Sequence, residues 1–101
     1  MKNSKFYSLT ASITGEPIAT LQSGYYDEHN NLYFYCTKYN SKYGTWYAID
    51  PATGLAVATG NTRKEAHKNA TAPGMLKKIN DKITQDMITR FNNLVMEAQC
   101  L

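Results

Sequence analysis

The stretch from Thr45 to Ala72 constrains the fold more than any other part of the chain. Residues 45–49 and 55–59 have the composition of two short strands, with a five-residue turn between them. Pro51 cannot continue a central strand, and Gly54 suits a left-handed residue at the end of such a turn. The chain then begins a helix. A β-hairpin that leads directly into a helix predicts an α+β fold.

The C-terminal part has a helical period. Thr62, followed three positions later by Glu65, has the pattern of a capping box, so we expect a short helix from Arg63 that Pro73-Gly74 interrupts. From there on, apolar residues recur every three or four positions, at Leu76, Ile79, Ile83, Met87, Phe91, Leu94 and Ala98. This spacing predicts a long C-terminal helix packed on one face of the sheet. The alternative is that Thr84 acts as a second N-cap and splits it.

The first half of the chain is punctuated by turns at strand-like spacing. Three further strands are expected there, over residues 6–13, 18–23 and 32–39. The second is the weakest, and we expect it to end at Gly24. Short links favour an antiparallel meander over parallel pairing. We therefore expect one α+β domain over residues 1–101, with four or five strands over roughly 5–60 and helices over roughly 63–99.

The expected core follows from these two periods. The first strand alternates, with Leu9 on its apolar face and Ser8 on its polar face. The predicted core residues are Leu9, Phe34, Ile49, Val57, Ile79, Ile83, Met87, Phe91 and Leu94. Met75, Ile88 and Val95 widen the helical stripe beyond what one sheet face requires. Because the stripe is this wide, an alternative is that part of it contacts a partner or a second copy of the chain.

Tyrosine is the outlier of the composition, because all eight tyrosines lie between Tyr7 and Tyr47. The candidate binding residues of this region share the outer face of the third strand or lie beside it: Tyr33, Tyr35, Tyr39 and Trp46, with Tyr47 as the alternative to Trp46, and the flanking Lys38 and Lys42. An aromatic sheet face flanked by lysines is typical of surfaces that stack single-stranded nucleic acid. It is equally typical of protein-binding hot spots. The competing interpretation is that tyrosine is simply a good strand former.

The net charge of +3 is unevenly placed. Residues 1–61 are neutral overall, whereas residues 62–90 carry seven basic and three acidic side chains, a net charge of +4. Lys78 and Lys82 lie one turn apart, and we expect them on the solvated side of the long helix, where they steer a partner toward the protein. The alternative is an ordinary solvated helix face.

The sequence has no recognisable catalytic or metal-binding motif. The only histidines, His29 and His67, lie in no elbow or Cys/His signature. Asp27, Glu28 and His29 are consecutive, so their side chains diverge and make a poor metal site. The single glycine of Gly60-Asn61-Thr62 does not make a phosphate-binding loop. We expect no enzymatic activity, no metal and no cofactor.

Compartment is inferred from what the chain lacks. The first seven residues contain no apolar segment of a signal peptide, and no run approaches the ~18 apolar residues that a membrane span needs. Cys36 and Cys100 are too few for a disulfide framework. Cys36 is expected to be buried and Cys100 exposed. These features favour a cytoplasmic protein that does not bind membranes.

One local passage has a counterpart in a known family. Residues 50–54 and 60–66, with their strand, Gly-x-Thr-x-x-Glu-Ala and helix start, resemble the corresponding passage of HicB-type antitoxins. The long C-terminal helix and the tyrosine-rich strands depart from that family's pattern, and we do not assign the chain to it.

We therefore expect a non-enzymatic interaction protein that binds a protein or nucleoprotein partner by occupying its surface. Small domains of this kind without motifs are typical of phage or mobile-element accessory proteins, including inhibitors of host defence complexes. The alternative is a nucleic-acid or nucleotide-binding module that uses the same aromatic face and the basic helix. A homo-oligomer is compatible with both.

Overall fold

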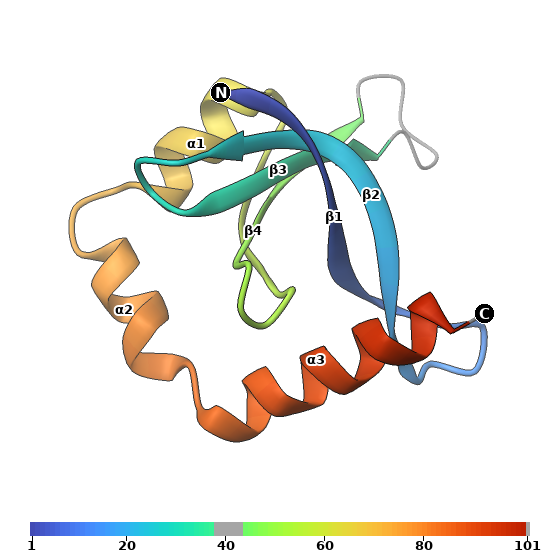
Figure 1. The fold of residues 1–101 in the computed structure, drawn as a ribbon. Helices are drawn as coiled ribbons and strands as arrows, with labels where there is room; N and C mark the ends of the chain where they lie inside the picture. Colours follow the sequence, from blue (N-terminus) through green and yellow to red (C-terminus); the bar gives the residue numbers. More distant parts are fainter. Residues whose placement is uncertain (38–43, 101) are drawn as a thin grey trace.

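The computed structural model describes residues 1–37 and 44–100 (Figure 1). In these residues five strands precede three helices: β1 (Lys2–Ala11), β2 (Pro17–Asp27), β3 (Leu32–Thr37), β4 (Thr45–Ile49), β5 (Ala56–Gly60), α1 (Arg63–Ala70), α2 (Met75–Lys82) and α3 (Gln85–Gln99). The strands form one antiparallel sheet in the order β1-β2-β3-β4-β5. The predicted α+β fold with a meander sheet is confirmed.

The turn between β4 and β5 has the predicted form. The Gly54 N–H donates to the Asp50 carbonyl over 2.8 Å, and Gly54 has a left-handed φ of 70°. The Asp50 carboxylate accepts two hydrogen bonds from Thr53, from its N–H at 3.0 Å and its hydroxyl at 2.7 Å. The Leu9 N–H of β1 donates to the Gly54 carbonyl at 2.8 Å. Because the first strand reaches the turn between the last two, the sheet is strongly curled.

One face of the sheet is covered by α1. The Thr62 hydroxyl accepts a hydrogen bond from the Glu65 N–H at 3.0 Å, as the capping pattern predicted. The small side chains of Ala66 and Ala70 are fully buried against β3, β4 and β5, where they meet a cluster that contains Phe34. Their size lets the helix backbone approach the sheet closely, and this cluster is the first of two cores.

The expected long C-terminal helix is in fact two helices. Ile83 has an extended backbone, and the Thr84 hydroxyl accepts a hydrogen bond from the Met87 N–H at 3.3 Å, so Thr84 is the second N-cap considered above. The two helices form an arm that passes below the β4–β5 turn (Figure 1). Phe91 of α3 is buried and α3 contacts β2, whereas α2 contains no fully buried residue.

The second strand does not end at Gly24, as the sequence suggested. β2 pairs with β1 along its whole length but with β3 only from Tyr25 to Asp27. A Cβ at Gly24 would overlap the Phe34 carbonyl group and lie 3.2 Å from Cε1 of Phe6. The glycine therefore lets the strand pass close to β3 instead of terminating it.

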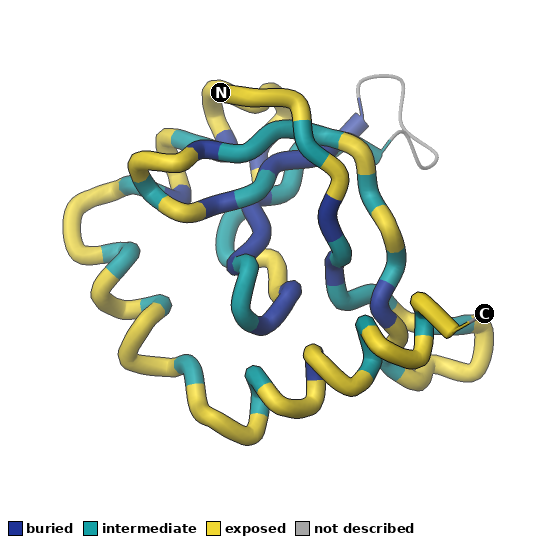
Figure 2. The backbone as a smooth tube through the Cα atoms, viewed as in Figure 1, coloured by how far each residue is buried: buried dark blue, intermediate teal, exposed yellow. Residues whose placement is uncertain are grey.

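The curled sheet encloses a second core on the face opposite α1. It consists of Phe6, Tyr35 and Ile49, which are 5%, 7% and 1% exposed. Of the other predicted core residues, Phe34 and Phe91 are buried, while the following are only half-buried: Leu9, Val57, Ile79, Ile83, Met87 and Leu94. Figure 2 shows this division, with buried segments in the strands and mostly exposed helices α2 and α3.

The alternation of β1 was misleading. Ser8 on its supposedly polar face is fully buried, whereas Leu9 on its apolar face is half-buried. The Gln22 side-chain amide donates to the Ser8 hydroxyl at 3.1 Å, which satisfies this buried polar group. The Ser8 face is enclosed because the sheet curls. The curl arises from contacts between distant residues, so the alternation within one strand does not predict it.

Candidate functional site

The face that carries Tyr33 and Tyr35 is largely an interior surface. Both lie opposite Phe34 on β3, as predicted, and Phe6 stacks on Tyr33 with ring centroids 4.4 Å apart. Tyr35 stacks on Tyr47 at 5.3 Å. Burial raises the pKa of the Tyr35 phenol, and the Tyr47 phenol adds to this, while a side-chain hydrogen bond with Ser8 opposes it. Tyr35 leaves little of its ring accessible to a partner.

Trp46 lies on the other face of the sheet from Tyr35. It pairs with Cys36 in the β3–β4 ladder, whereas Tyr47 pairs with Tyr35, so Tyr47 is the residue that joins the tyrosine face. Cys36 is half-buried and Cys100 exposed, and both are free thiols. Tyr39, Lys38 and Lys42 lie outside the described residues.

Trp46 belongs to a different cluster, which we name the aromatic–basic patch: Tyr25, Trp46, Arg63 and Lys64. The rings of Tyr25 and Trp46 are half-buried, with centroids 6.1 Å apart. The guanidinium carbon of Arg63 stands 4.3 Å from the centre of the Tyr25 ring, a cation–π arrangement. These four side chains line a shallow depression together with Met1 and Thr62. The patch combines aromatic surface with positive charge at the start of α1.

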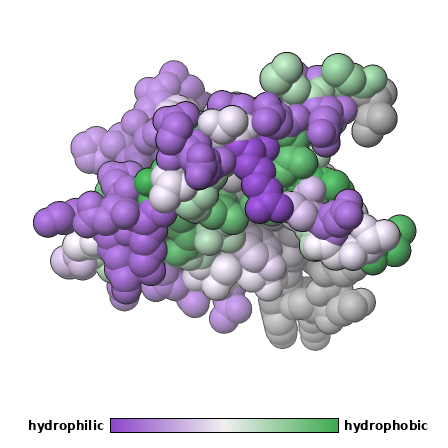
Figure 3. Space-filling model, turned by 90° about the horizontal axis from the view of Figure 1, so that it is seen from below, coloured by the Kyte–Doolittle hydropathy of each residue, from purple (hydrophilic) through white to green (hydrophobic). Residues whose placement is uncertain are grey.

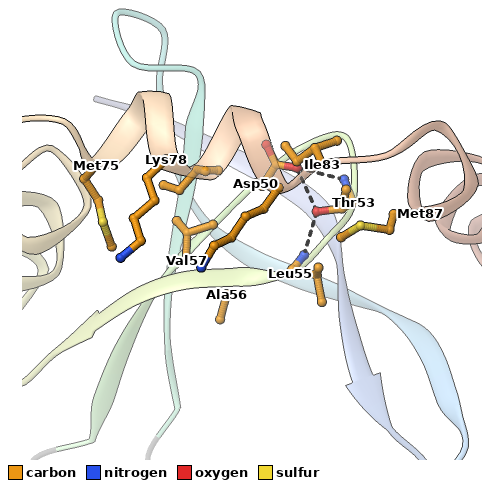
Figure 4. Close-up of a pocket in the computed structure, with 11 residues that line it drawn as sticks. Asp50, Thr53, Leu55, Ala56, Val57, Met75, Lys78, Ile83 and Met87 are labelled. Atoms are coloured by element: carbon orange, nitrogen blue, oxygen red, sulfur yellow. Dashed lines mark hydrogen bonds between the residues drawn. The ribbon is translucent and has the colours of Figure 1, made fainter.

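Lys78 and Lys82 are both exposed, and both line a groove. This α2 groove is a hollow of about 320 Å³ between α2, the start of α3, β5 and the turn before it (Figure 4). Its apolar lining comes from seven residues: Leu55, Ala56, Val57, Met75, Ile79, Ile83 and Met87. In Figure 4 Met75 and Lys78 extend from α2 toward β5. Figure 3, viewed from the side of α2 and α3, shows apolar surface set between hydrophilic side chains.

The sequence of α2 explains why the groove stays open. Met75, Ile79 and Ile83 recur every four residues and are all half-buried. Leu76, next to this row on the helix surface, packs against the first core. The left-handed Gly74 begins α2 without a side-chain cap. The helix is thus attached to the protein through Leu76, while its apolar row lies above the groove without being fully covered.

The two lysines of the groove have no acidic partner in the described part of the chain. The ion pairs found there are Lys2–Glu28 at 2.6 Å and His67–Asp27 at 2.9 Å. Asp50 also lines the groove, but its carboxylate accepts the hydrogen bonds from Thr53 (Figure 4). The groove therefore combines apolar walls with two lysines that form no ion pair and one carboxylate that Thr53 holds in the turn. The wide apolar stripe was the only sequence signal for it.

A polar cluster at the β2–β3 turn joins this turn to α1. The Asp27 carboxylate lies 2.9 Å from His67 Nε2 and accepts a hydrogen bond from the Asn30 amide at 2.7 Å. Burial raises the pKa of the Asp27 carboxyl, but the hydrogen bonds from Asn30 and His67 together lower it by more. The pKa of Asp27 therefore lies below the usual value of 3.8. The backbone N–H of His29 also donates to Asp27. His29 itself is exposed.

This cluster has the chemistry of a structural clamp. Across residues 1–37 and 44–100, no hydrogen bond joins the His67 ring to a serine, threonine or cysteine that it could activate. In the same residues no three His, Cys, Asp or Glu side chains are grouped to hold a metal ion. The clamp fixes the β2–β3 turn against α1, on the face that Phe34 and His67 share at a ring distance of 5.7 Å.

Compared with protein-family models, curated proteins and solved structures, the chain gives no match. The local likeness of residues 50–66 to HicB-type antitoxins is thus not accompanied by a family match. None of the described helices is long and apolar enough to cross a membrane.

Proposed function

We propose that this is a non-enzymatic interaction protein that binds a protein partner through the α2 groove. The supporting observation is that α2 and the following Ile83 hold three apolar side chains over a hollow of about 320 Å³, together with two lysines that form no ion pair with a described residue. Apolar concave surfaces with a few charged groups are the usual sites of recognition. Burial of such a row stabilises a complex, and exposed lysines accelerate the encounter with an acidic surface.

The proposal also moves the binding surface away from the tyrosines. Tyr35 is packed between Ser8, Phe6 and Tyr47, so it contributes to the fold and not to a desolvated contact. Occupation of a partner's surface, the mode of action expected of phage or mobile-element inhibitors, needs one accessible apolar area. The α2 groove supplies that area.

Affinity capture from a lysate of the native host tests the proposal. The bait is the protein itself, compared with Ile79→Asp in the groove and with Ile13→Asp at a fully exposed position. We expect the parent and Ile13→Asp to capture the same protein, also after nuclease treatment. Ile79→Asp should fail to capture it. Circular dichroism verifies that both variants remain folded. Retention of the captured protein by folded Ile79→Asp contradicts the proposal.

A second candidate function, nucleic-acid or nucleotide binding, has its own supporting observation. The aromatic–basic patch places Arg63 over the Tyr25 ring next to Trp46, and bases stack on such side chains. Titration of labelled single-stranded DNA tests it. If the patch binds nucleic acid, affinity falls as salt rises, and Arg63→Ala weakens binding while Lys77→Ala on α2 has a smaller effect. Equal effects of the two changes indicate non-specific attraction.

A further inference from the structure

The proposed function leaves the chemistry of the partner open, and the α2 groove constrains it. Resting on that function, we infer that the groove binds an acidic, amphipathic peptide segment of the partner protein. Such a segment carries apolar side chains that fill the hollow and carboxylates that pair with Lys78 and Lys82. The inference depends on the charge of the groove, on its lining and on how α2 is attached.

The charge of the groove favours an anionic occupant. Lys78 and Lys82 are one helical turn apart and both line the hollow, so their ammonium groups flank the same apolar walls. Neither forms an ion pair with a described residue, and the one carboxylate in the lining, Asp50, accepts hydrogen bonds from Thr53, so the charged residues of the lining sum to +1. A partner with carboxylates at matching spacing gains attraction without losing an existing pair, whereas a basic partner is repelled.

The lining favours a flexible polymer with several apolar side chains. Met75 and Met87 stand at the two ends of the row that Ile79 and Ile83 complete. Methionine is unbranched and polarizable, so it adapts to irregular apolar side chains, as in grooves that bind amphipathic helices. Helix α2 is also bounded by non-helical residues, Gly74 at its start and Ile83 at its end.

Selection from a displayed random-peptide library tests the inference. The target is the parent protein, and counter-selection uses Lys78→Glu/Lys82→Glu, which reverses the charge of the groove. We expect the enriched peptides to combine Asp or Glu with Leu, Ile, Phe or Met. Their affinity, measured by fluorescence anisotropy, should fall about tenfold on the double variant, since two attractions become repulsions. The matched control Lys5→Glu/Lys68→Glu changes the net charge equally at exposed positions outside the groove and should leave binding nearly unchanged.

Four results overturn the inference. These are selection of neutral or basic peptides, enrichment of no peptide, equal binding by the two double variants, or tighter binding of dodecanoate than of any peptide at the α2 amides in NMR titrations. The last result would assign the groove to small anionic amphiphiles. If Ile79→Asp abolishes capture of the natural partner while the groove double variant retains it, the proposed function stands and its acidic specificity fails. If Ile79→Asp retains capture, the proposed function itself fails.

Discussion

The tyrosine face and the α2 groove are both lined by apolar side chains, and they differ in what covers them. On the tyrosine face, β1 curls until Phe6 stacks on Tyr33 and the Leu9 N–H reaches the Gly54 carbonyl. At the groove, α2 passes the edge strand β5 without burying any of its own residues fully. The first surface is covered by other residues of the same chain, whereas the described residues leave the second one open.

The difference shows that the apolar character of a segment says little about where its partner lies. A strand with aromatic side chains and a helix with an apolar stripe both lose water-exposed area on contact, whether the contact is internal or external. Segments with internal contacts contribute to stability, whereas a segment left open contributes to recognition. Substitutions in the two regions should therefore separate stability from binding.

The largest expected effect is on the tyrosine face. Tyr35→Ala should lower the free energy of unfolding by about 3–5 kcal/mol, because a buried ring is lost and a cavity remains. Urea denaturation followed by circular dichroism measures it. Ile13→Ala, at a fully exposed position, is the control and should change stability by no more than about 0.5 kcal/mol. Equal stability of the two variants would show that the tyrosine face is a solvent-exposed surface.

The next effect concerns the curl that covers this face. Gly24→Ala introduces a Cβ against the Phe34 carbonyl and the Phe6 ring, and overpacking of this kind costs about 1–3 kcal/mol. We expect a lower urea midpoint and stronger binding of a hydrophobic dye as the Phe6–Tyr33 contact loosens. A variant with the parent's stability and dye binding would mean that the hairpin covers the tyrosines without a close approach at Gly24.

A smaller effect is expected in the groove. Ile79→Ala should cost about 1 kcal/mol, because this side chain is only half-buried and its removal opens no closed cavity. The same change should weaken capture of the partner at least as strongly as it affects folding. Urea denaturation and affinity capture on the same variant compare the two quantities. A stability loss as large as that of Tyr35→Ala would place Ile79 in the core.

The smallest effect is pH-dependent and concerns the clamp between the β2–β3 turn and α1. Because the pKa of Asp27 is lowered in the folded protein, its ionised form stabilises the fold above the unfolded pKa of about 4. This contribution is lost as the pH falls through the lower folded pKa. The free energy of unfolding at acidic and neutral pH should therefore differ less in Asp27→Asn than in the parent. An identical pH dependence contradicts the clamp.

Local patterns were sufficient for much of the fold. Pro51 and Gly54 specify a turn, and Thr62 and Thr84 supply hydroxyls that cap helices, so the positions of these elements follow from a few neighbouring residues. The meander order follows from short links between strands. Each of these features depends on hydrogen bonds or backbone conformations that span only a few residues, and the sequence records such interactions directly.

Only the tertiary structure decided which faces are covered. The curl that buries Ser8 and Tyr35 brings the Leu9 N–H to the Gly54 carbonyl, a contact between residues far apart in the sequence. The same holds for the groove, because only the folded chain places the exposed Lys78 beside the apolar side chains of the hollow above β5. Strand and helix periods indicate which residues share a face. Whether that face is buried depends on which other elements the folded chain packs against it. For this reason the sequence determined the elements, and the fold determined which apolar surface stayed open.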